Sequence, residues 1–563
     1  MTTLKEYVIT VRDWNDVDPI YDQMEAVSGS KYIPDRSVEV LKEKPISRST
    51  HYLMTDEEAK TLKQDPRILD VDIPIYQKPG VKLLPCFEQY SNRWDKSLPG
   101  TVVDKNWALP RCTIGHNASW GSDNVPTAEA TVNVRAEGRN VDVIVADGHI
   151  DVNHPEVVST VSGATTRVTQ FNWLSLNPQV LGGGAVAGTY SYAGGTADEN
   201  NHGQHVAGTI AGNTLGWARF ANIYNISPYA GSPVSSAYLY DYIRVWHKQK
   251  AVNPITGFKN PTIVNMSYGY FASALVSSIS SINYRGVTSN PLGSSSALTS
   301  RGATGISTVT SGAFPGTYLS FGVRSLADDS DIQDAIAEGI VFVGAAGNAN
   351  DTIVNSSSSD FNNYLVSSSI GIGTQFYMKG ATPGSAPNVI CVGAVDATAT
   401  ERKVNFSSTG TRVDIFAPGT RIMSAIRTKK TYDAGLPTEV SYSLLDSSSG
   451  YYYEKYNGTS MASPQVCGAL ACEMENYPTM NQAMARTYIT NRLIETNALL
   501  STGSGATDYT FTNGIRGAAN NYLKHRNQRN ASGPVHPNSA NWLRPTSGLT
   551  YPRSRNKTIR VGV

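Results

Sequence analysis

The sequence predicts an α/β protein in which helices cover both faces of a parallel sheet. Three observations support this prediction. Short, almost continuously apolar segments recur through the middle of the chain, helical segments lie between them, and Ser-, Thr- and Gly-rich stretches interrupt this rhythm without ending it. Strands buried on both faces have this apolar character, and alternation with helices is typical of parallel sheets.

The composition is that of a globular protein without a dominant charge. The chain has 563 residues, of which 40% are hydrophobic and 17% charged, and its net charge is +1. No overall field therefore predicts binding to nucleic acid or to a membrane surface. No apolar run approaches the about 18 residues of a membrane-spanning helix. The N-terminal segment MTTLKEYVITVRDWNDVD has no apolar core of a signal peptide, which favours an intracellular or virion-associated protein over classical secretion.

The N-terminal segment predicts a small α+β unit over residues 1–76. Residues 6–13 alternate like a strand, a polar helical stretch extends to about residue 27, and residues 51–74 have the pattern strand, helix, strand. Thr55 and Glu58 have the spacing of a capping box at the start of the helix. Residues 77–104 are rich in Pro, Gly and charge without periodicity, and we interpret them as a linker.

The α/β alternation occupies the middle of the chain. The expected buried strands are residues 140–147, 261–269, 339–348 and 388–395, and the expected helices are residues 203–212, 235–249 and 330–339. The Ser-, Thr- and Gly-rich stretches at 184–197, 271–320, 349–374 and 428–452 are expected to be surface insertions, because the strand pattern resumes after each of them. Functional groups of such a sheet collect at the carboxyl ends of its strands.

The cysteines do not predict a disulfide scaffold. There are five, Cys86, Cys112, Cys391, Cys467 and Cys472, which are too few and too scattered. Cys391 and Cys467 lie in apolar segments, so we expect thiols buried in the core rather than a catalytic cysteine.

Four polar residues at the ends of predicted elements form a candidate catalytic set. Asp147 ends an apolar strand, His202 begins a helix, Asn348 follows another strand, and Ser460 precedes a helix. Each alone is as readily structural as catalytic. Together they provide an orienting carboxylate, a base, an oxyanion donor and a nucleophile, and Asp, His, Ser is one of the known orders of this triad. His202 and His205 lack the intervening Glu of an HExxH metal motif.

At these residues the sequence resembles the subtilases, the subtilisin-like serine proteases. The matching motifs, spread from about residue 105 to 497, are VIVADGHIDVNHPEV, NHGQHVAGT, IVNMSYG, VFVGAAGN, TPGSAPNVICVGAV, VNFSSTGTRVDIFAPG and GTSMASP. The segment GWARFANIYNI is similar to the proteinase K-like branch. The N-terminal unit, with DEEAKTLKQDPRILDVD, is similar to the ferredoxin-like inhibitor propeptide of the family, which is cut off at maturation.

The resemblance implies an autoprocessed serine endopeptidase with a subtilisin-like peptidase domain over residues 105–499. The linker at 77–104 would contain or adjoin the processing site. Asp147, His202 and Ser460 would form the triad, and Asn348 would stabilise the oxyanion together with the backbone N–H of Ser460. Residues implied to bind substrate are Ser267, Tyr268 and Gly269 on one side and Gly231 on the other. Extended polypeptides would be the substrates, and the propeptide an intramolecular inhibitor.

Several positions depart from the family pattern or remain open. Gly148 and His149 follow the aspartate where the family usually has Ser or Thr and then Gly, so a hydroxyl donor to the carboxylate is lost. This departure leaves a catalytically silent subtilase fold, used for structure or binding, as the alternative function. Esterase or ligase activity through the same acyl-enzyme is a third. We expect His205 to be a packed helix residue rather than a second base, and His154 and Asp151 to be loop structure.

Cofactors and partners are less well defined by the sequence. The expected chemistry requires no cofactor. Calcium sites in the family are borne by loops, and Glu156 is a candidate ligand, but a lone carboxylate does not identify a site. After Asp508 there is no acidic residue, and nine basic residues follow. The extension at 500–563 is either a solvated tail or a segment that docks to an acidic partner.

Overall fold

The structure is a computed structural model. It describes residues 4–26, 29, 38–42, 47–85, 108, 112, 132–134, 136–159, 165–180, 196–213, 215–229, 238–290, 294–311, 314–371, 373–395, 403–427, 451–490, 494–495, 522–523 and 528–530.

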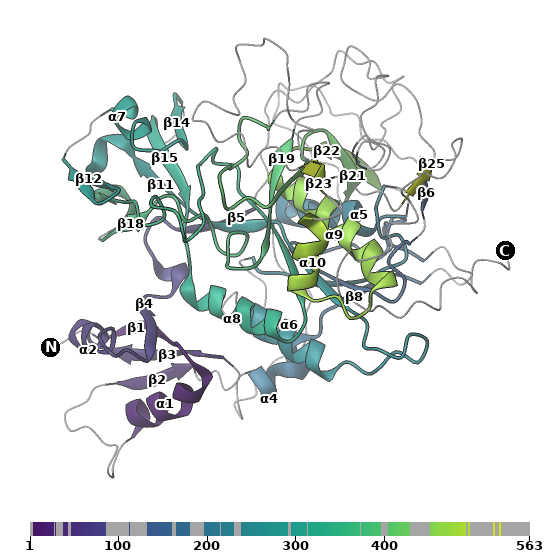
Figure 1. Cartoon of the computed structure of the whole chain (residues 1–563), viewed down its shortest axis with the longest axis horizontal. Coiled ribbons are helices and arrows are strands. Elements are labelled where there is room, and N and C mark those ends of the chain that lie inside the picture. The colour runs from purple at the N-terminus through teal and green to yellow at the C-terminus, as the bar shows by residue number, and fades with distance from the viewer. Residues whose placement is uncertain are drawn as a thin grey trace.

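The N-terminal unit is an antiparallel sheet covered by two helices, as the sequence predicts (Figure 1). Its strand order is β2 (Glu39–Lys42), β3 (Ser49–Met54), β1 (Lys5–Val11) and β4 (Ile68–Asp72), and its helices are α1 (Val17–Glu25) and α2 (Asp56–Leu62). Thr55 and Glu58 form the expected capping box. The unit has its own apolar core, which includes Ile9, Ile20 and Tyr52.

In the described part of the chain the main sheet has nine strands, and its parallel centre confirms the α/β prediction. In spatial order the strands are β23 (Ile494–Glu495), β24 (Tyr522–Leu523), β20 (Ile415–Pro418), β19 (Ile390–Val395), β16 (Val341–Ala345), β10 (Thr262–Met266), β7 (Asp142–Ala146), β9 (Asn222–Ile226) and β8 (Val168–Gln170). All neighbouring pairs are parallel except β23 with β24.

Helices cover both faces of this sheet. One face packs against α5 (Ala197–Ala211) and α9 (Thr459–Asn476), and the other packs against α6 (Leu239–Gln249) and α8 (Leu326–Ala337). Each of the three predicted helices exists, but α5 and α8 begin earlier than expected. Their starts are polar, and the caps Thr196 and Ser325 define them. Short helices α4 (Asn177–Val180) and α10 (Gln482–Tyr488) complete this part.

The insertion between β10 and β16 folds into two further antiparallel sheets. One contains β14 (Ile306–Val309), β15 (Gly316–Gly322), β11 (Tyr268–Leu275) and β5 (Lys82–Pro85). The other, which also uses strands beyond β16, contains β13 (Val287–Ser289), β12 (Ile279–Tyr284), β17 (Tyr364–Ser367) and β18 (Gln375–Phe376). With helix α7 (Ser295–Thr299) they enclose a separate apolar cluster. The described part of this Ser-rich insertion is therefore folded.

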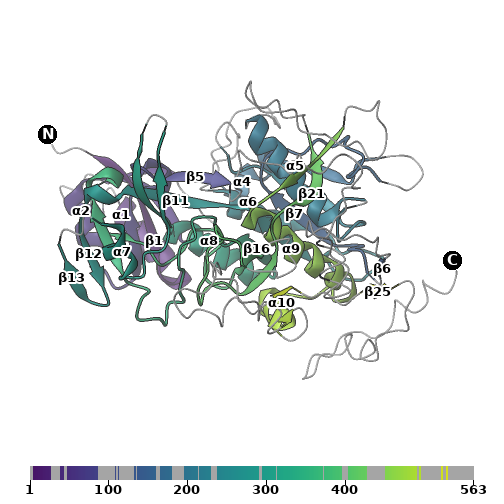
Figure 2. The ribbon, with the colours of Figure 1, turned by 90° about the horizontal axis from the view of Figure 1, so that it is seen from above.

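Strand β5 differs from the linker interpretation of residues 77–104. It pairs antiparallel with β11, although β5 comes from the N-terminal part of the chain and β11 follows the central strand β10 (Figure 2). Backbone pairing to an open strand edge requires no side-chain periodicity, which is why the sequence pattern did not show this strand.

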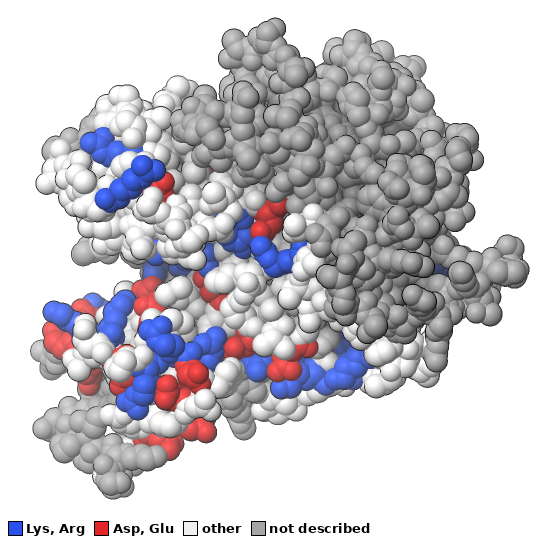
Figure 3. Space-filling model, viewed as in Figure 1, with Lys and Arg blue, Asp and Glu red and all other residues white. Residues whose placement is uncertain are grey.

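The N-terminal unit also contacts helix α8. The Ser47 hydroxyl donates to Asp331 Oδ1 at 2.5 Å, and Trp14 Nε1 donates to Asp334 Oδ1 at 3.3 Å. Arg48 Nε lies 3.4 Å from the Asp334 carboxylate. Figure 3 shows acidic and basic side chains interspersed over this unit and its junction with the rest of the chain, so the contact is electrostatically mixed.

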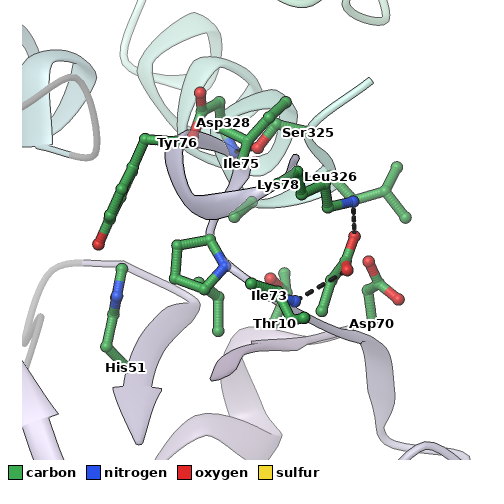
Figure 4. A pocket seen from close by; sticks show the side chains of 14 residues that line it. Thr10, His51, Asp70, Ile73, Ile75, Tyr76, Lys78, Ser325, Leu326 and Asp328 are labelled. Atoms are coloured by element: carbon green, nitrogen blue, oxygen red, sulfur yellow. Dashed lines mark hydrogen bonds and ion pairs between the residues drawn. The ribbon is translucent and has the colours of Figure 1, made fainter. Parts of the chain in front are cut away.

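A pocket lies at this junction, between the N-terminal sheet and the first turn of α8 (Figure 4). His51, Tyr76 and Asp328 are among the residues that line it. His51 Nδ1 lies 2.6 Å from Glu6 Oε1, which also accepts a hydrogen bond from the Tyr76 hydroxyl at 3.0 Å. None of the predicted catalytic residues lines this pocket.

The described pieces of the C-terminal extension pair with the rest of the chain. Strand β24 lies inside the main sheet, and β25 (Gln528–Asn530) pairs with β6 (Val132–Val134). The remaining strands, β21 (Ile422–Ile426) and β22 (Tyr452–Tyr456), form a hairpin-like pair beside α5. None of the helices in the described part of the chain has both the length and the apolar character that crossing a bilayer requires.

Candidate active site

The predicted site residues follow neighbouring parallel strands. Asp147 follows β7, Ser267 follows β10, and Asn348 lies shortly after β16. In the sheet Ala146 pairs with Met266, and Met266 pairs with Gly344. Because the strands are parallel, the residues that follow them lie at one edge of the sheet, where α/β proteins place their functional groups.

Asp147 and His202 form a buried pair at this edge. His202 Nδ1 lies 2.7 Å from Asp147 Oδ1, and neither side chain is exposed. The backbone N–H of Gly148 also donates to Asp147 Oδ1, at 2.7 Å. Burial raises the pKa of the Asp147 carboxyl above its ordinary value, and the charge and hydrogen bond of His202 oppose that rise. The pair fixes the ring so that Nε2 is the nitrogen left for proton transfer.

The second carboxylate oxygen of Asp147, Oδ2, has no donor among the described residues, as the missing hydroxyl at position 148 predicts. A Cβ on Gly148 would lie 1.8 Å from the carbonyl oxygen of Glu199, so the backbone of α5 occupies the space of a side chain. Glycine is therefore required by the close approach of the aspartate loop to the histidine helix.

Ser460 lies in the first turn of α9. Gly458 precedes the helix with a φ of +152°, a conformation that favours glycine. The Ser460 hydroxyl donates to the carbonyl oxygen of Ser267 at 2.9 Å, and the Ser267 hydroxyl donates to the carbonyl oxygen of Ser460 at 3.0 Å. The nucleophile candidate is thus held directly beside the strand that is predicted to bind substrate. N–H groups in the first turn of a helix have no acceptor within it, which suits oxyanion binding.

Thr459 orients the side-chain amide of Asn348. Its backbone N–H and its hydroxyl both donate to Asn348 Oδ1, at 3.0 and 2.9 Å, and its hydroxyl oxygen accepts from the N–H of Gly347 at 3.2 Å. With Oδ1 held in this way, Nδ2 of Asn348 is buried and has no acceptor among the described residues. A buried donor without an acceptor is the arrangement that an oxyanion would satisfy. Thr459 was not among the predicted site residues, although it lies beside Ser460.

The predicted substrate strand is present and already occupied. Gly269 pairs with Leu84 and Tyr268 with Pro85, so β5 lies along the edge of β11 as an extended peptide would. The Tyr268 side chain is buried and its hydroxyl lies 3.1 Å from that of Tyr240, so Tyr268 offers substrate its backbone rather than its ring. Gly231, predicted for the opposite side, lies outside the described residues.

Two predicted structural histidines are placed as expected. His205 Nε2 lies 2.8 Å from the carbonyl oxygen of Ile422, and its ring stacks on Tyr456. Burial lowers the pKa of His205 to about 3, so it is a neutral packed residue. His154 Nδ1 accepts from the N–H of Glu156, and the Asp151 carboxylate accepts from the N–H of Asn153 in the same loop.

His149 and Glu156 both make structural contacts beside the aspartate loop. His149 is buried, burial lowers its pKa to about 4, and its φ is not positive, so its backbone carries no left-handed strain. Glu156 Oε1 accepts from the Tyr453 hydroxyl and Oε2 from the N–H of Leu215. In the described part of the chain no group of three or more His, Cys, Asp or Glu side chains could hold a metal ion.

Three amide side chains that are not among the predicted site residues hold the aspartate loop. Asn225 Oδ1 accepts from the N–H of Ile150, Asn200 Oδ1 from that of His149, and Gln204 Oε1 from that of Asp151. The position of Asn225 beside the strand of Asp147 depends on the pairing of β9 with β7, which periodicity alone does not give.

Residues 138–515 match the subtilase family. The chain belongs to this family. Curated relatives include an alkaline proteinase of Hapsidospora chrysogena, 26% identical over 59% of this chain and 57% of its own length, and subtilisin-like protease 3 of Arthroderma otae, 27% identical over 71% and 68%. Subtilisin E of Bacillus subtilis (strain 168) is 27% identical over 62% and 59%. The chain thus spans about three fifths to two thirds of the length of these relatives.

Among solved structures, fervidolysin from Fervidobacterium pennivorans matches this subtilase with 19% identity and a TM-score of 0.47, covering 95% of this chain and 62% of that one. The family match covers every predicted catalytic residue of this subtilase, from Asp147 to Ser460.

Proposed function

We propose that this subtilase is a serine endopeptidase that is synthesised as a proenzyme and processes itself. The observation that carries the proposal is the fully buried Asp147–His202 pair, with 2.7 Å between Oδ1 and Nδ1, at the sheet edge that also presents Ser460 and Asn348. A buried carboxylate that fixes one ring nitrogen of a histidine is the support that a general base needs.

The chemistry uses only groups of the chain and water. The Ser460 hydroxyl first leaves the Ser267 carbonyl by rotation about its Cα–Cβ bond and gives its proton to Nε2 of His202 as Oγ attacks the substrate carbonyl. The oxyanion is stabilised by the N–H of Ser460 and by Nδ2 of Asn348. His202 then protonates the leaving amine, and a water molecule hydrolyses the acyl-enzyme by the reverse proton transfers. Asp147 stabilises the charged ring throughout.

The N-terminal unit acts in this proposal as the intramolecular inhibitor. Strand β5, which follows the unit in the chain, pairs with β11, the strand edge that an extended substrate would need. The contacts of Trp14, Ser47 and Arg48 with α8 anchor the unit to the rest of the chain. Substrate cannot pair with an edge that is already paired, so the unprocessed chain is inactive toward other polypeptides.

The test is the intact mass of the purified chain over time at neutral pH. We expect wild type to lose its N-terminal unit and then to digest an unfolded protein such as casein, and Ser460→Ala to remain at full length. Ser296→Ala, an exposed serine on α7, is the matched control and should mature like wild type. A folded wild type that neither matures nor reacts with diisopropyl fluorophosphate would contradict the proposal and favour the catalytically silent alternative.

A further inference from the structure

We propose that the ring of Phe271 restricts the residue before the cut to a small side chain. This inference rests on the proposed protease function and adds to it the class of substrate, which is a polypeptide with alanine, glycine or serine as the residue whose carbonyl is attacked. It follows from two glycines beside the site and from one ring that lies against both of them.

Two neighbouring segments of the chain carry glycines at matching positions beside the site. Strands β10 and β16 are parallel neighbours in the main sheet, and their last pair is Met266 with Gly344. Three residues beyond this pair each segment has a glycine, which is Gly269 after β10 and Gly347 after β16. A glycine has no side chain, so the backbones themselves form the walls of the space between the two segments.

The first turn of α9 holds both segments, and this fixes where substrate must enter. The Ser460 hydroxyl donates to the carbonyl oxygen of Ser267 at 2.9 Å, and the Thr459 hydroxyl donates to Asn348 Oδ1 at 2.9 Å. The attacked carbonyl must reach both Ser460 Oγ and Asn348 Nδ2, so it lies where the two segments meet. The Cα of the residue before the cut is bonded to that carbonyl carbon. Its side chain therefore starts at the mouth of the space between the segments.

The ring of Phe271 fills this space. A Cβ on Gly269 would lie 3.1 Å from Cε2 of the ring, and a Cβ on Gly347 would lie 3.0 Å from Cε1. Both distances are shorter than the about 3.5–4.0 Å of an ordinary contact between carbon atoms, so one ring lies against both backbones. Phe271 comes two residues after Gly269 in β11, and positions two apart in a strand share a face. The ring therefore leans back along β11 toward the nucleophile.

The surroundings of Phe271 hold the ring at this place. The backbone of Phe271 is fixed in the sheet of the insertion, where it pairs with Gly322 of β15. A Cβ on Gly269 would also lie 2.9 Å from the Cβ of Ala381, which is buried, so this methyl group closes another side of the space. Phe271 itself is only partly buried. Its ring is therefore the wall that an entering substrate side chain would meet.

The occupied space predicts a preference for small residues before the cut. A methyl or hydroxymethyl group fits at the mouth, whereas a leucine or phenylalanine side chain would overlap the ring of Phe271. A single methylene in an apolar pocket already changes kcat/KM by about 10- to 200-fold. Overlap with a whole ring involves more atoms than one methylene. We therefore expect the mature enzyme to cleave after alanine at least about 100-fold more efficiently than after phenylalanine.

The experiment is kcat/KM of the mature enzyme on the p-nitroanilides of Ala-Ala-Pro-X, where X is alanine, leucine or phenylalanine. Titration with diisopropyl fluorophosphate gives the concentration of active sites. Phe271→Ala removes the ring and should raise the ratio of kcat/KM for phenylalanine to that for alanine by at least about 100-fold. Phe271→Leu should raise this ratio by less. Phe258→Ala is the control and should leave the ratio unchanged, because Phe258 is an exposed ring in the loop before β10, at the opposite edge of the sheet.

The outcomes separate this inference from the protease function. A wild type that cleaves after leucine or phenylalanine as well as it does after alanine overturns the inference, and this result needs no variant to fold. An unchanged ratio in both Phe271→Ala and Phe271→Leu also overturns it, because another group would then set the preference. In both cases the peptides are cut, so the protease function stands. A wild type that the fluorophosphate labels but that does not cut the alanine peptide overturns the inference as well. A folded wild type that neither cuts a peptide nor is labelled contradicts the protease function, and the inference falls with it.

Discussion

Replacement of Thr459 by valine tests whether this residue orients the oxyanion donor. Valine keeps the shape of the side chain and the backbone N–H that donates to Asn348 Oδ1, but it removes the hydroxyl that donates to the same oxygen at 2.9 Å. A neutral hydrogen bond contributes about 0.5–1.5 kcal/mol. Since about 1.4 kcal/mol corresponds to a factor of ten in rate, kcat should fall roughly 2- to 12-fold.

The upper limit of this effect is the loss of Asn348 itself. Removal of one such donor costs about 10²–10³ in kcat, a magnitude that was measured in subtilisin, a member of the same family. The oxyanion forms only in the transition state, so KM should change little. The hydroxyl also accepts from the N–H of Gly347, so Thr459→Val should destabilise the folded chain by about 1–3 kcal/mol.

The assay is kcat and KM of the mature enzyme on a chromogenic peptide, for Thr459→Val, Asn348→Ala and the double variant. If Thr459 acts through Asn348, the double variant should be no slower than Asn348→Ala alone. Thr487→Val, on the exposed face of α10, is the control and should not change kcat. An unchanged kcat in Thr459→Val, or losses that multiply in the double variant, would refute the reasoning.

Three further predictions concern the loop, the inhibitor and pH. Gly148→Ser, in the Ser460→Ala background, should lower the Tm strongly because its Cβ would overlap the Glu199 carbonyl, and an unchanged Tm would contradict that packing. Arg48→Ala removes the contact with Asp334, which contributes about 1 kcal/mol. The lag before protease activity appears from the full chain should therefore become roughly fivefold shorter. An unchanged lag would contradict an anchoring role of Arg48. His205→Gln should make the free energy of unfolding decrease less between pH 7 and pH 5 than it does in wild type, as measured by urea unfolding.

The sign of the pH effect follows from the lowered pKa of His205. The folded pKa is about 3 and the ordinary value is 6.5, so between these values the unfolded chain binds a proton that the folded chain excludes. Stability therefore falls as pH decreases through this window, by about 1.4 kcal/mol per pH unit for one group. His149 and His247, with pKa values lowered to about 4, act in the same direction. Equal pH slopes for wild type and His205→Gln would contradict the assignment.

The sequence by itself determined four central strands of the main sheet and the main helices, and it predicted the catalytic set. The apolar segments at β7, β10, β16 and β19 are buried on both faces, and such burial is recorded in local composition. Asp147, His202, Asn348 and Ser460 could be predicted as a candidate set because each lies at the end of an element that the sequence marks. The capping box of Thr55 and Glu58 is a contact within one turn, so it could be predicted as well.

Only the tertiary structure decided the features that depend on segments distant in the sequence. The pairing of β5 with β11, the contact between Gly148 and the backbone of α5, and the hold of Thr459 on Asn348 each join such segments. Backbone pairing at a strand edge uses groups that every residue carries. A close approach of two backbones is visible in the sequence only as a glycine. These contacts leave little pattern in the sequence. They decide which strand pairs with the predicted substrate edge and how the predicted oxyanion donor is oriented.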